Sequence, residues 1–176
     1  MNNKVDITFL IPSFNESGNI ISVYEDIRSE FKNILLSYEI IFIDDGSTDN
    51  SKKKLAGLKK KNKSLKYITL SKNIGKARAL EGGISYAEGK YLIIMDGDFQ
   101  YRAKDALKIY KIAKKGYKVV SGLRINRKDK LLVKIFSYFY NTTLYLLTMI
   151  YMKDAFSGLK CMELKMVRSL SLNGGL

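Results

Sequence analysis

The chain has 176 residues and 46% of them are hydrophobic, which suits one domain with a packed core and argues against a disordered protein. It contains no histidine and a single cysteine, Cys161, so catalysis by histidine, histidine-based zinc sites and an internal disulfide are excluded. The net charge of +14 leaves open a nucleic acid, an anionic membrane surface or a solvated exterior. Because arginine is scarce and no arginine–aromatic motif is present, we interpret the charge as a solvated lysine surface and expect no nucleic-acid partner.

Apolar runs and helical patterns alternate along most of the chain. The apolar runs predict five strands, at residues 7–12, 39–43, 67–70, 91–95 and 118–121. The spacing of apolar residues between them predicts four helices, namely one with the face Ile20, Tyr24, Ile27, Phe31 and Ile34, one at residues 51–61, one with the face Ala77, Leu80, Ile84 and Ala87, and one at residues 103–115 that ends at Gly116. This alternation predicts an α/β fold, in which helices cover both faces of a mostly parallel sheet.

Each predicted strand is followed by a polar loop. These loops lie at residues 13–16, 44–49, 71–76, 96–100 and 122–124. Ligands of parallel sheets bind beyond the carboxyl ends of the strands. The five loops therefore predict a functional site at that edge.

The loop at residues 96–100 gives the clearest indication of chemistry. Asp96 and Asp98 follow a buried strand, and such a pair can hold Mg²⁺ or Mn²⁺ from one side while a diphosphate takes the other. Gln100 could add an oxygen ligand or position a phosphate. A second acidic turn at residues 44–49 follows another apolar run. Together the two turns predict a site for a metal-bound nucleotide.

Other polar residues in these loops have both a binding and a structural interpretation. Asn15 and Glu16 could bind a base or ribose, but a helix that begins nearby also needs polar caps. Asp45 and Asp49 could cap the helix at residues 51–61, and for Asp49 we prefer that interpretation. These alternatives cannot be separated by local pattern.

The loop at residues 71–76 precedes a helix. Gly75 permits a close approach of the backbone to a ligand. The start of the helix, together with Lys76 or Arg78, would attract a phosphate. Beside the acidic loops, this favours a diphosphate ligand.

Residues 131–152 are almost all apolar or aromatic, and their few polar side chains share one narrow helical stripe. Three interpretations are a core helix, a transmembrane span, and an amphipathic element at a membrane interface. We prefer the last, because tyrosine and phenylalanine with flanking lysine suit that layer. The chain begins without a signal peptide, so we expect its start to lie in the cytoplasm.

Several motifs, in this order, resemble the family-2 glycosyltransferases with the GT-A fold. They are residues 9–16 (FLIPSFNE), 44–49 (DDGSTD), 73–76 (NIGK) and 96–100 (DGDFQ). Two more, residues 121–124 (SGLR) and 154–160 (DAFSGLK), are most similar to dolichyl- and polyprenyl-phosphate sugar transferases. The resemblance covers essentially the whole chain. It implies an inverting enzyme that moves a sugar from a UDP- or GDP-linked donor to a polyprenyl or dolichyl phosphate at the cytoplasmic face of a membrane.

The resemblance also implies roles for individual residues. The nucleotide sugar would contact Pro12, Asn15, Glu16, Asp44, Asp45, Asn73, Lys76 and Asp96. The metal, Mg²⁺ or Mn²⁺, would be held by Asp96, Asp98 and Gln100. The acceptor phosphate would meet Arg124, Ser157 and Lys160. Asp98, Asp154 and Arg124 would act in catalysis, with Asp154 orienting the acceptor unless it only caps a loop or helix.

The acceptor side departs from the family pattern at two positions. Lys160 stands where arginine is usual and Leu159 replaces an aromatic residue, so one positive charge remains but the bidentate fork is lost. An acceptor phosphate is ionised near neutral pH, because its second pKa is about 6. It could therefore attack the anomeric carbon without a strong general base.

The resemblance also predicts the organisation of the chain. Residues 1–123 would form the nucleotide-sugar-binding GT-A core, and residues 124–176 an acceptor-side and membrane-interface segment that ends short of its relatives. A true membrane span at residues 131–152 would separate Asp154 from Asp98, and one active site cannot work across a bilayer. This favours an element that lies on the membrane surface.

Two alternatives belong to other functional classes. One is a family-2 transferase that acts on a glycan or a soluble sugar; processive polysaccharide synthases are disfavoured, because their Gln-x-x-Arg-Trp element needs a tryptophan and the chain has none. The other is a truncated, non-catalytic module that binds nucleotide sugars. Turnover of a nucleotide sugar would separate these classes.

Overall fold

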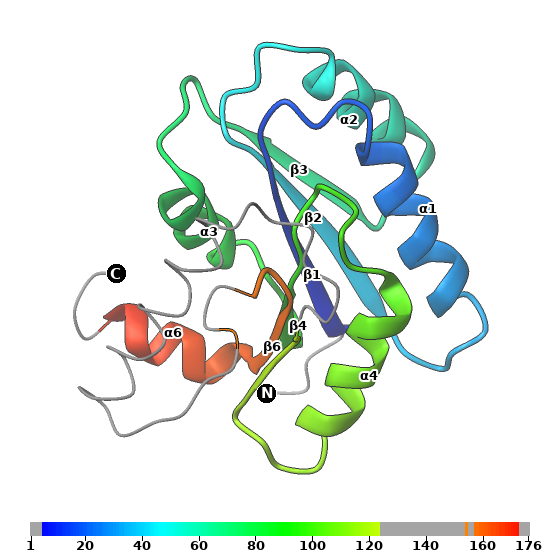
Figure 1. Cartoon of the computed structure of the whole chain (residues 1–176), viewed down its shortest axis with the longest axis vertical. Coiled ribbons are helices and arrows are strands. Elements are labelled where there is room, and N and C mark those ends of the chain that lie inside the picture. The colour runs from blue at the N-terminus through cyan, green and yellow to red at the C-terminus, as the bar shows by residue number, and fades with distance from the viewer. Residues whose placement is uncertain (1–4, 124–153, 155–156, 173–176) are drawn as a thin grey trace.

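The computed structural model describes residues 5–123, 154 and 157–172 (Figure 1). Six strands form one sheet in this part of the chain: β1 (Val5–Ser13), β2 (Tyr38–Asp44), β3 (Leu65–Thr69), β4 (Gly89–Ile94), β5 (Val119–Ser121) and β6 (Lys160–Glu163). The helices there are α1 (Ile20–Phe31), α2 (Ser51–Lys61), α3 (Lys76–Ile84), α4 (Ala103–Ala113) and α6 (Leu164–Leu172). The predicted α/β fold, with strands and helices in alternation, is confirmed.

The sheet has the strand order β3-β2-β1-β4-β6-β5. Strands β1 to β4 run parallel, and β6 lies antiparallel between β4 and β5. The sequence did not predict β6, because Lys160–Glu163 is short, carries a charge at each end and shows no clear alternation. Residues 160–172, which we had expected in an acceptor-side segment, thus contribute a strand to the sheet and a helix beside it.

The hydrophobic core has two layers, one on each face of the sheet. The larger layer lies under α1, α2 and α4, where the ring of Phe9 meets the edge of Phe31 at a centroid distance of 5.1 Å. The smaller layer lies under α3 and α6 and includes Leu10. The lone cysteine, Cys161, is buried in the larger layer, and this burial raises the pKa of its thiol to about 12. A thiol in this state is an unreactive packing group.

The predicted faces of two helices have different outcomes. The four residues Ile20, Tyr24, Ile27 and Phe31 of α1 are all buried, as expected. In α3 the buried residues are Ala79, Gly83 and Ile84, whereas Ala77 is exposed. Of the predicted face, Ile84 and Ala87 are buried and Leu80 packs against the smaller core layer, so only Ala77 departs from the prediction.

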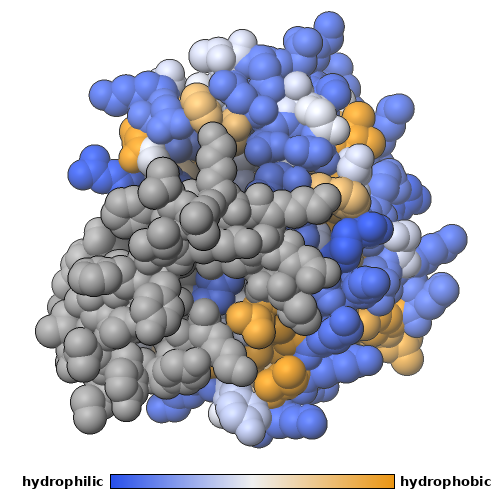
Figure 2. All heavy atoms as spheres, viewed as in Figure 1, coloured by the Kyte–Doolittle hydropathy of each residue, from blue (hydrophilic) through white to orange (hydrophobic). Residues whose placement is uncertain are grey.

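The surface of the described residues is largely hydrophilic. Figure 2 shows hydrophilic residues over much of the coloured face, and most lysines of α2 and α4 are exposed, in agreement with a solvated lysine surface. No helix in the described ranges has the length and apolarity needed to cross a bilayer. The interfacial element predicted at residues 131–152 lies outside the described residues.

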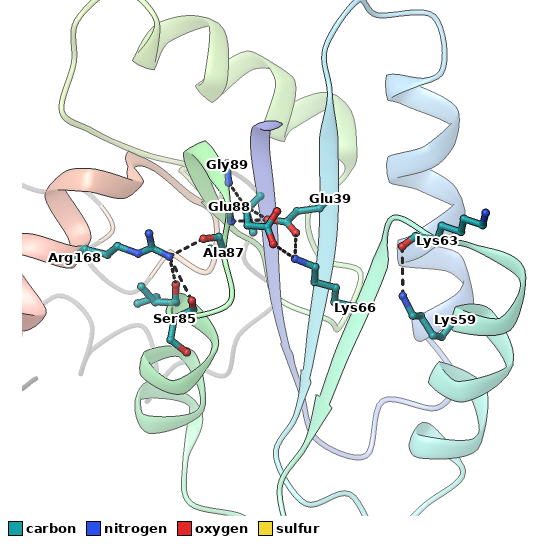
Figure 3. A network of polar contacts seen from close by, with 11 residues as sticks. Glu39, Lys59, Lys63, Lys66, Ser85, Ala87, Glu88, Gly89 and Arg168 are labelled. Atoms are coloured by element: carbon teal, nitrogen blue, oxygen red, sulfur yellow. Dashed lines mark hydrogen bonds and ion pairs between the residues drawn. The ribbon is translucent and has the colours of Figure 1, made fainter. Parts of the chain in front are cut away.

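A buried carboxylate ties together the amino ends of the parallel strands (Figure 3). Glu39 is only 4% exposed, and its Oε1 accepts hydrogen bonds from Thr8 Oγ1 at 2.7 Å and from the backbone N–H of Glu88 at 2.6 Å. Its Oε2 pairs with Lys66 Nζ at 2.9 Å. Thr8 Oγ1 in turn accepts the N–H of Gly89 at 2.9 Å. This network connects β1, β2, β3 and β4 at the edge opposite the acidic loops.

The variant Glu39→Ala tests the importance of this network. It leaves the Thr8 hydroxyl and the Glu88 N–H without their acceptor, so we expect the free energy of unfolding to fall by about 2 kcal/mol. Urea unfolding measures this change. Glu88→Ala removes the exposed partner of the same lysine, Lys66, and should have a much smaller effect. Equal losses in the two variants would contradict a special role for Glu39.

Candidate functional site

A pocket opens at the carboxyl edge of the parallel strands. Its lining residues are Pro12, Ser13, Phe14, Glu16, Asp45, Lys76, Asp96, Gly97 and Asp98. They come from the ends of β1, β2 and β4 and from the first residue of α3. The pocket thus lies at the edge where the polar loops predicted a site, and it brings together six of the predicted residues.

The loops after β1 and β2 hold each other by hydrogen bonds. The N–H of Asn15 donates to Ser47 Oγ at 2.9 Å, and the N–H of Thr48 donates to Asn15 Oδ1 at 2.9 Å. The N–H of Ser17 donates to Asp49 Oδ2 at 3.0 Å. Helix α1 begins at Ile20, after Asn19, so the alternative in which Asn15 caps this helix was wrong. Asn15 is exposed and lies outside the pocket lining.

The two aspartates considered as caps of α2 have different partners. Asp49 Oδ1 accepts the N–H of Ser51, the first residue of α2, at 2.9 Å, which confirms its capping role. The carboxylate of Asp45 instead accepts the N–H groups of Ile74 at 2.8 Å and Gly75 at 3.0 Å. Capping was therefore a wrong interpretation for Asp45, which holds the loop after β3 while lining the pocket.

The loops after β2 and β3 touch at a glycine. Gly46 has φ of 71°, and a Cβ placed on it would lie 2.4 Å from the backbone carbonyl carbon of Lys72. Only glycine fits that contact without displacing backbone. Asn73, which we had predicted to contact the nucleotide sugar, is exposed and accepts the N–H of Gly75 at 3.2 Å. It does not line the pocket.

Asp44 ends β2 as a fully buried carboxylate. Its Oδ1 accepts the N–H of Ser47 at 3.1 Å, whereas its Oδ2 is buried without a hydrogen-bond partner among the described residues. Buried polar atoms are normally satisfied by protein, water or ligand. Asp44 Oδ2 is therefore a buried acceptor at this edge that a donor from water or a ligand could satisfy.

Two segments converge on Asp96. Its Oδ1 forms an ion pair with Nζ of Lys76. From another side Gly158 packs so closely that a Cβ placed on it would lie 1.9 Å from Asp96 Oδ2. Lys160 lies within the same electrostatic environment, since burial and then the charge of Lys76 lower its pKa while Asp154 and Asp96 oppose that change. The start of α3 and the segment before β6 thus meet at the acidic loop after β4.

The three predicted metal ligands have different positions. Asp96 and Asp98 line the pocket, but Gln100 is exposed and lies outside the lining. The N–H of Gln100 donates to Asp98 Oδ1 at 3.1 Å, so Gln100 contacts the acidic loop through its backbone. The structure therefore brings together two of the three.

A buried hydrogen bond joins Tyr101 to Ser157 of the segment before β6, with 2.8 Å between Tyr101 Oη and Ser157 Oγ. Ser157 Oγ also donates to the carbonyl of Leu159 at 3.2 Å. Ser157, which we had expected at the acceptor phosphate, thus contacts the loop after β4. Asp154 is buried nearby, and Arg124 lies outside the described residues. Sequence reasoning missed Tyr101 and Gly158 as contact residues, because neither contact partner is close in sequence.

A mostly parallel sheet with its pocket at the carboxyl edge and an antiparallel strand inserted beside β4 is the architecture of GT-A glycosyltransferase structures. The mannosyltransferase PcManGT from Pyrobaculum calidifontis, in complex with GDP-Man and Mn²⁺, has a TM-score of 0.64 and 20% identity over 96% of this chain and 49% of its own. Glucosyl-3-phosphoglycerate synthase from Mycobacterium tuberculosis, in complex with Mn²⁺, UDP-glucose and phosphoglyceric acid, has a TM-score of 0.72 and 18% identity over 94% and 59%. These likenesses show that the fold is of the GT-A type.

The chain belongs to glycosyl transferase family 2, whose profile matches residues 8–165. A putative glycosyltransferase, CsbB, from Bacillus subtilis (strain 168) is 36% identical over 137 residues, which are 76% of this chain and 41% of the relative. The undecaprenyl-phosphate 4-deoxy-4-formamido-L-arabinose transferase of Serratia proteamaculans (strain 568) is 32% identical over 124 residues, 70% of this chain and 38% of the relative. The aligned region is thus well under half the length of these curated relatives.

The variant Gly158→Ala tests whether the segment before β6 holds Asp96 in place. The added methyl group would collide with the Asp96 carboxylate, which can turn away, so we expect the fold to survive and the predicted metal site to weaken. Mn²⁺ binding with a nucleoside diphosphate present, measured by electron paramagnetic resonance, should weaken about tenfold. Gly82→Ala is the matched control, because nothing lies within 4 Å of its added Cβ. Wild-type affinity in Gly158→Ala would contradict the close packing on Asp96.

Proposed function

We propose that this chain binds a UDP- or GDP-sugar in the pocket and transfers the sugar, with inversion, to a polyprenyl or dolichyl phosphate at the cytoplasmic face of a membrane. The observation that carries the proposal is the meeting of Lys76, Asp96 and Asp98 in one pocket at the carboxyl edge of the sheet. Membership of the family supports transfer of a sugar. Relatives named as undecaprenyl-phosphate transferases support the lipid acceptor, and structural neighbours with GDP-Man or UDP-glucose and Mn²⁺ support the donor.

Asp96 and Asp98 would hold the divalent cation, Mg²⁺ or Mn²⁺. No group of three or more His, Cys, Asp or Glu side chains that could hold a metal occurs within the described ranges, so Asp96 and Asp98 would act as a pair. Two carboxylates fit a cation that shares its other positions with water and substrate phosphates. When bound, the cation would supply neutralisation of the charge on the leaving diphosphate.

The donor would find two further partners. Lys76 already contacts the anionic Asp96, and a diphosphate would be an alternative anion for the same ammonium group at the start of α3. Asp44 has a buried oxygen without a partner among the described residues, and a ring N–H of uracil or guanine would satisfy it. Both bases carry such an N–H, so the proposal includes both UDP-linked and GDP-linked sugars.

The acceptor phosphate would attack the anomeric carbon of the sugar. A bond forms between phosphate oxygen and carbon while the bond from carbon to the nucleoside diphosphate breaks, which inverts the configuration. The phosphate is already ionised near neutral pH, because its second pKa is about 6. Lys160 and Arg124 would attract it, and Asp154 would orient it. Ser157 would keep this segment in place through its bond to Tyr101.

Turnover tests the proposal. Radiolabelled UDP- and GDP-sugars are incubated with undecaprenyl phosphate and Mn²⁺, and we expect a labelled product that partitions into organic solvent. Asp98→Asn should lower kcat/KM about 100-fold, because stabilisation of the leaving diphosphate is weakened. Glu25→Gln, an exposed change on α1, is the charge-matched control and should have no effect. A folded wild-type chain that turns over no donor would contradict the proposal.

The same assay tests the nature of the acceptor. One structural neighbour is a synthase with bound phosphoglyceric acid, which keeps a soluble acceptor as the second candidate. A labelled product that stays in water would contradict the lipid acceptor while leaving sugar transfer intact.

A further inference from the structure

An ion pair outside the pocket joins helix α1 to the loop that carries Asp96 and Asp98. Asp26 lies on α1, and its Oδ1 accepts hydrogen bonds from both Nε and Nη2 of Arg102, at 3.0 Å and 2.5 Å. Its Oδ2 accepts the N–H of Ala103, the first residue of α4, at 2.6 Å. Asp26 therefore fixes Arg102 in one orientation and also accepts a backbone N–H at the start of α4 that has no partner within the helix.

Arg102 in turn covers Phe99. The guanidinium carbon lies 4.7 Å from the centroid of the Phe99 ring. Phe99 follows Asp98 directly and has φ of 63°, in the left-handed region that a bulky residue rarely adopts. A residue in that region keeps its conformation only when its surroundings hold it there. The larger core layer contacts Phe99 and the guanidinium of Arg102 lies above its ring, so these two contacts can hold the conformation.

The conformation of Phe99 determines where Asp98 points. Asp98 Oδ1 accepts the N–H of Gln100, so the carboxylate and the backbone on both sides of Phe99 form one small turn. If Phe99 relaxed to negative φ, the N–H of Gln100 would rotate away and the Asp98 carboxylate would lose this partner.

We propose that Asp26 and Arg102 are positioning residues that hold Phe99 in its left-handed conformation and thereby aim Asp98 into the pocket. This inference rests on the proposed function, because it assumes that Asp98 binds a cation. Arginine is needed, since its planar fork can bond Asp26 twice while its face lies on the ring, and lysine can do only one of these.

The position of the pair argues against a role in stability alone. The Arg102 side chain is 52% exposed and that of Asp26 12%, and an ion pair that is open to solvent on one side contributes less to stability than a fully buried one. Asp26 raises the pKa of Arg102, and among the other described carboxylates Asp105 does so as well. Asp105 is itself paired with Lys108. The bond of Asp26 to Ala103 is independent of Arg102, so changes at Arg102 leave the start of α4 capped.

Mn²⁺ titrations followed by electron paramagnetic resonance test this inference, with UDP or GDP present at a saturating level. Arg102→Ala should weaken Mn²⁺ binding about tenfold, the lower end of what loss of an outer partner costs a metal ligand. Arg102→Lys should recover little of this affinity. Phe99→Leu, which removes the ring, should also weaken Mn²⁺ binding. It is the second test of the inference if Arg102→Ala folds poorly. Nucleotide binding in EDTA should stay close to wild type in all three, and the midpoint of urea unfolding should stay close to wild type in the two Arg102 variants, whereas Phe99→Leu also loses packing against the core.

Arg28→Ala is the matched control, because this exposed arginine pairs with Glu25 on the same helix as Asp26. It should leave Mn²⁺ affinity unchanged. Wild-type Mn²⁺ affinity in Arg102→Ala and Phe99→Leu would overturn the inference while leaving the proposed function intact. A parallel fall of stability and metal-free nucleotide binding would also overturn it, since the pair would then be structural. A wild-type chain that binds no Mn²⁺ with either nucleotide would contradict the proposed function itself, and the inference with it.

Discussion

The arrangement of this edge of the molecule depends on the contacts of one carboxylate, that of Asp96. It pairs with Lys76 from the start of α3 and lies against the backbone of Gly158, so it joins segments that are far apart in sequence. A buried or half-buried carboxylate needs a cation or hydrogen-bond donors. The lysine meets that need in the free protein, and a divalent cation with its diphosphate would meet it in the proposed complex. The fold would thus keep the site charged and closely packed in both states.

The loops at this edge are held together by side chains that reach from one loop to another, in one case across the two strands that lie between β3 and β4. Asn15 bonds the loop after β2, and Asp45 bonds the loop after β3. Lys76 reaches the loop after β4, and Tyr101 bonds the segment before β6. Because strands β1 to β4 are parallel, all of these loops emerge on the same side. A pocket built in this way has a shape that no single loop determines.

Local patterns predicted the features whose partners are local. The strands and helices up to residue 121 follow from periodicity, and Asp49 caps α2 two residues further along the chain. Prediction failed where the partner is distant. Asp45 bonds amides 29 and 30 residues away, and Asn15 bonds a loop 33 residues away, so capping motifs could not separate these roles. Strand β6 has no alternation of its own and is held by β4 and β5. The interfacial element at residues 131–152 and the role of Arg124 remain predictions.

A calorimetric titration tests most directly whether the acidic edge is a metal–nucleotide site. UDP and GDP are each added to the wild-type chain, once with Mn²⁺ and once with EDTA. We predict that one nucleotide binds with Mn²⁺ and that EDTA removes most of this affinity, because Asp96 and Asp98 hold the diphosphate through the cation. Equal binding in EDTA, or no binding of either nucleotide by a folded chain, would contradict a metal–nucleotide site at this edge.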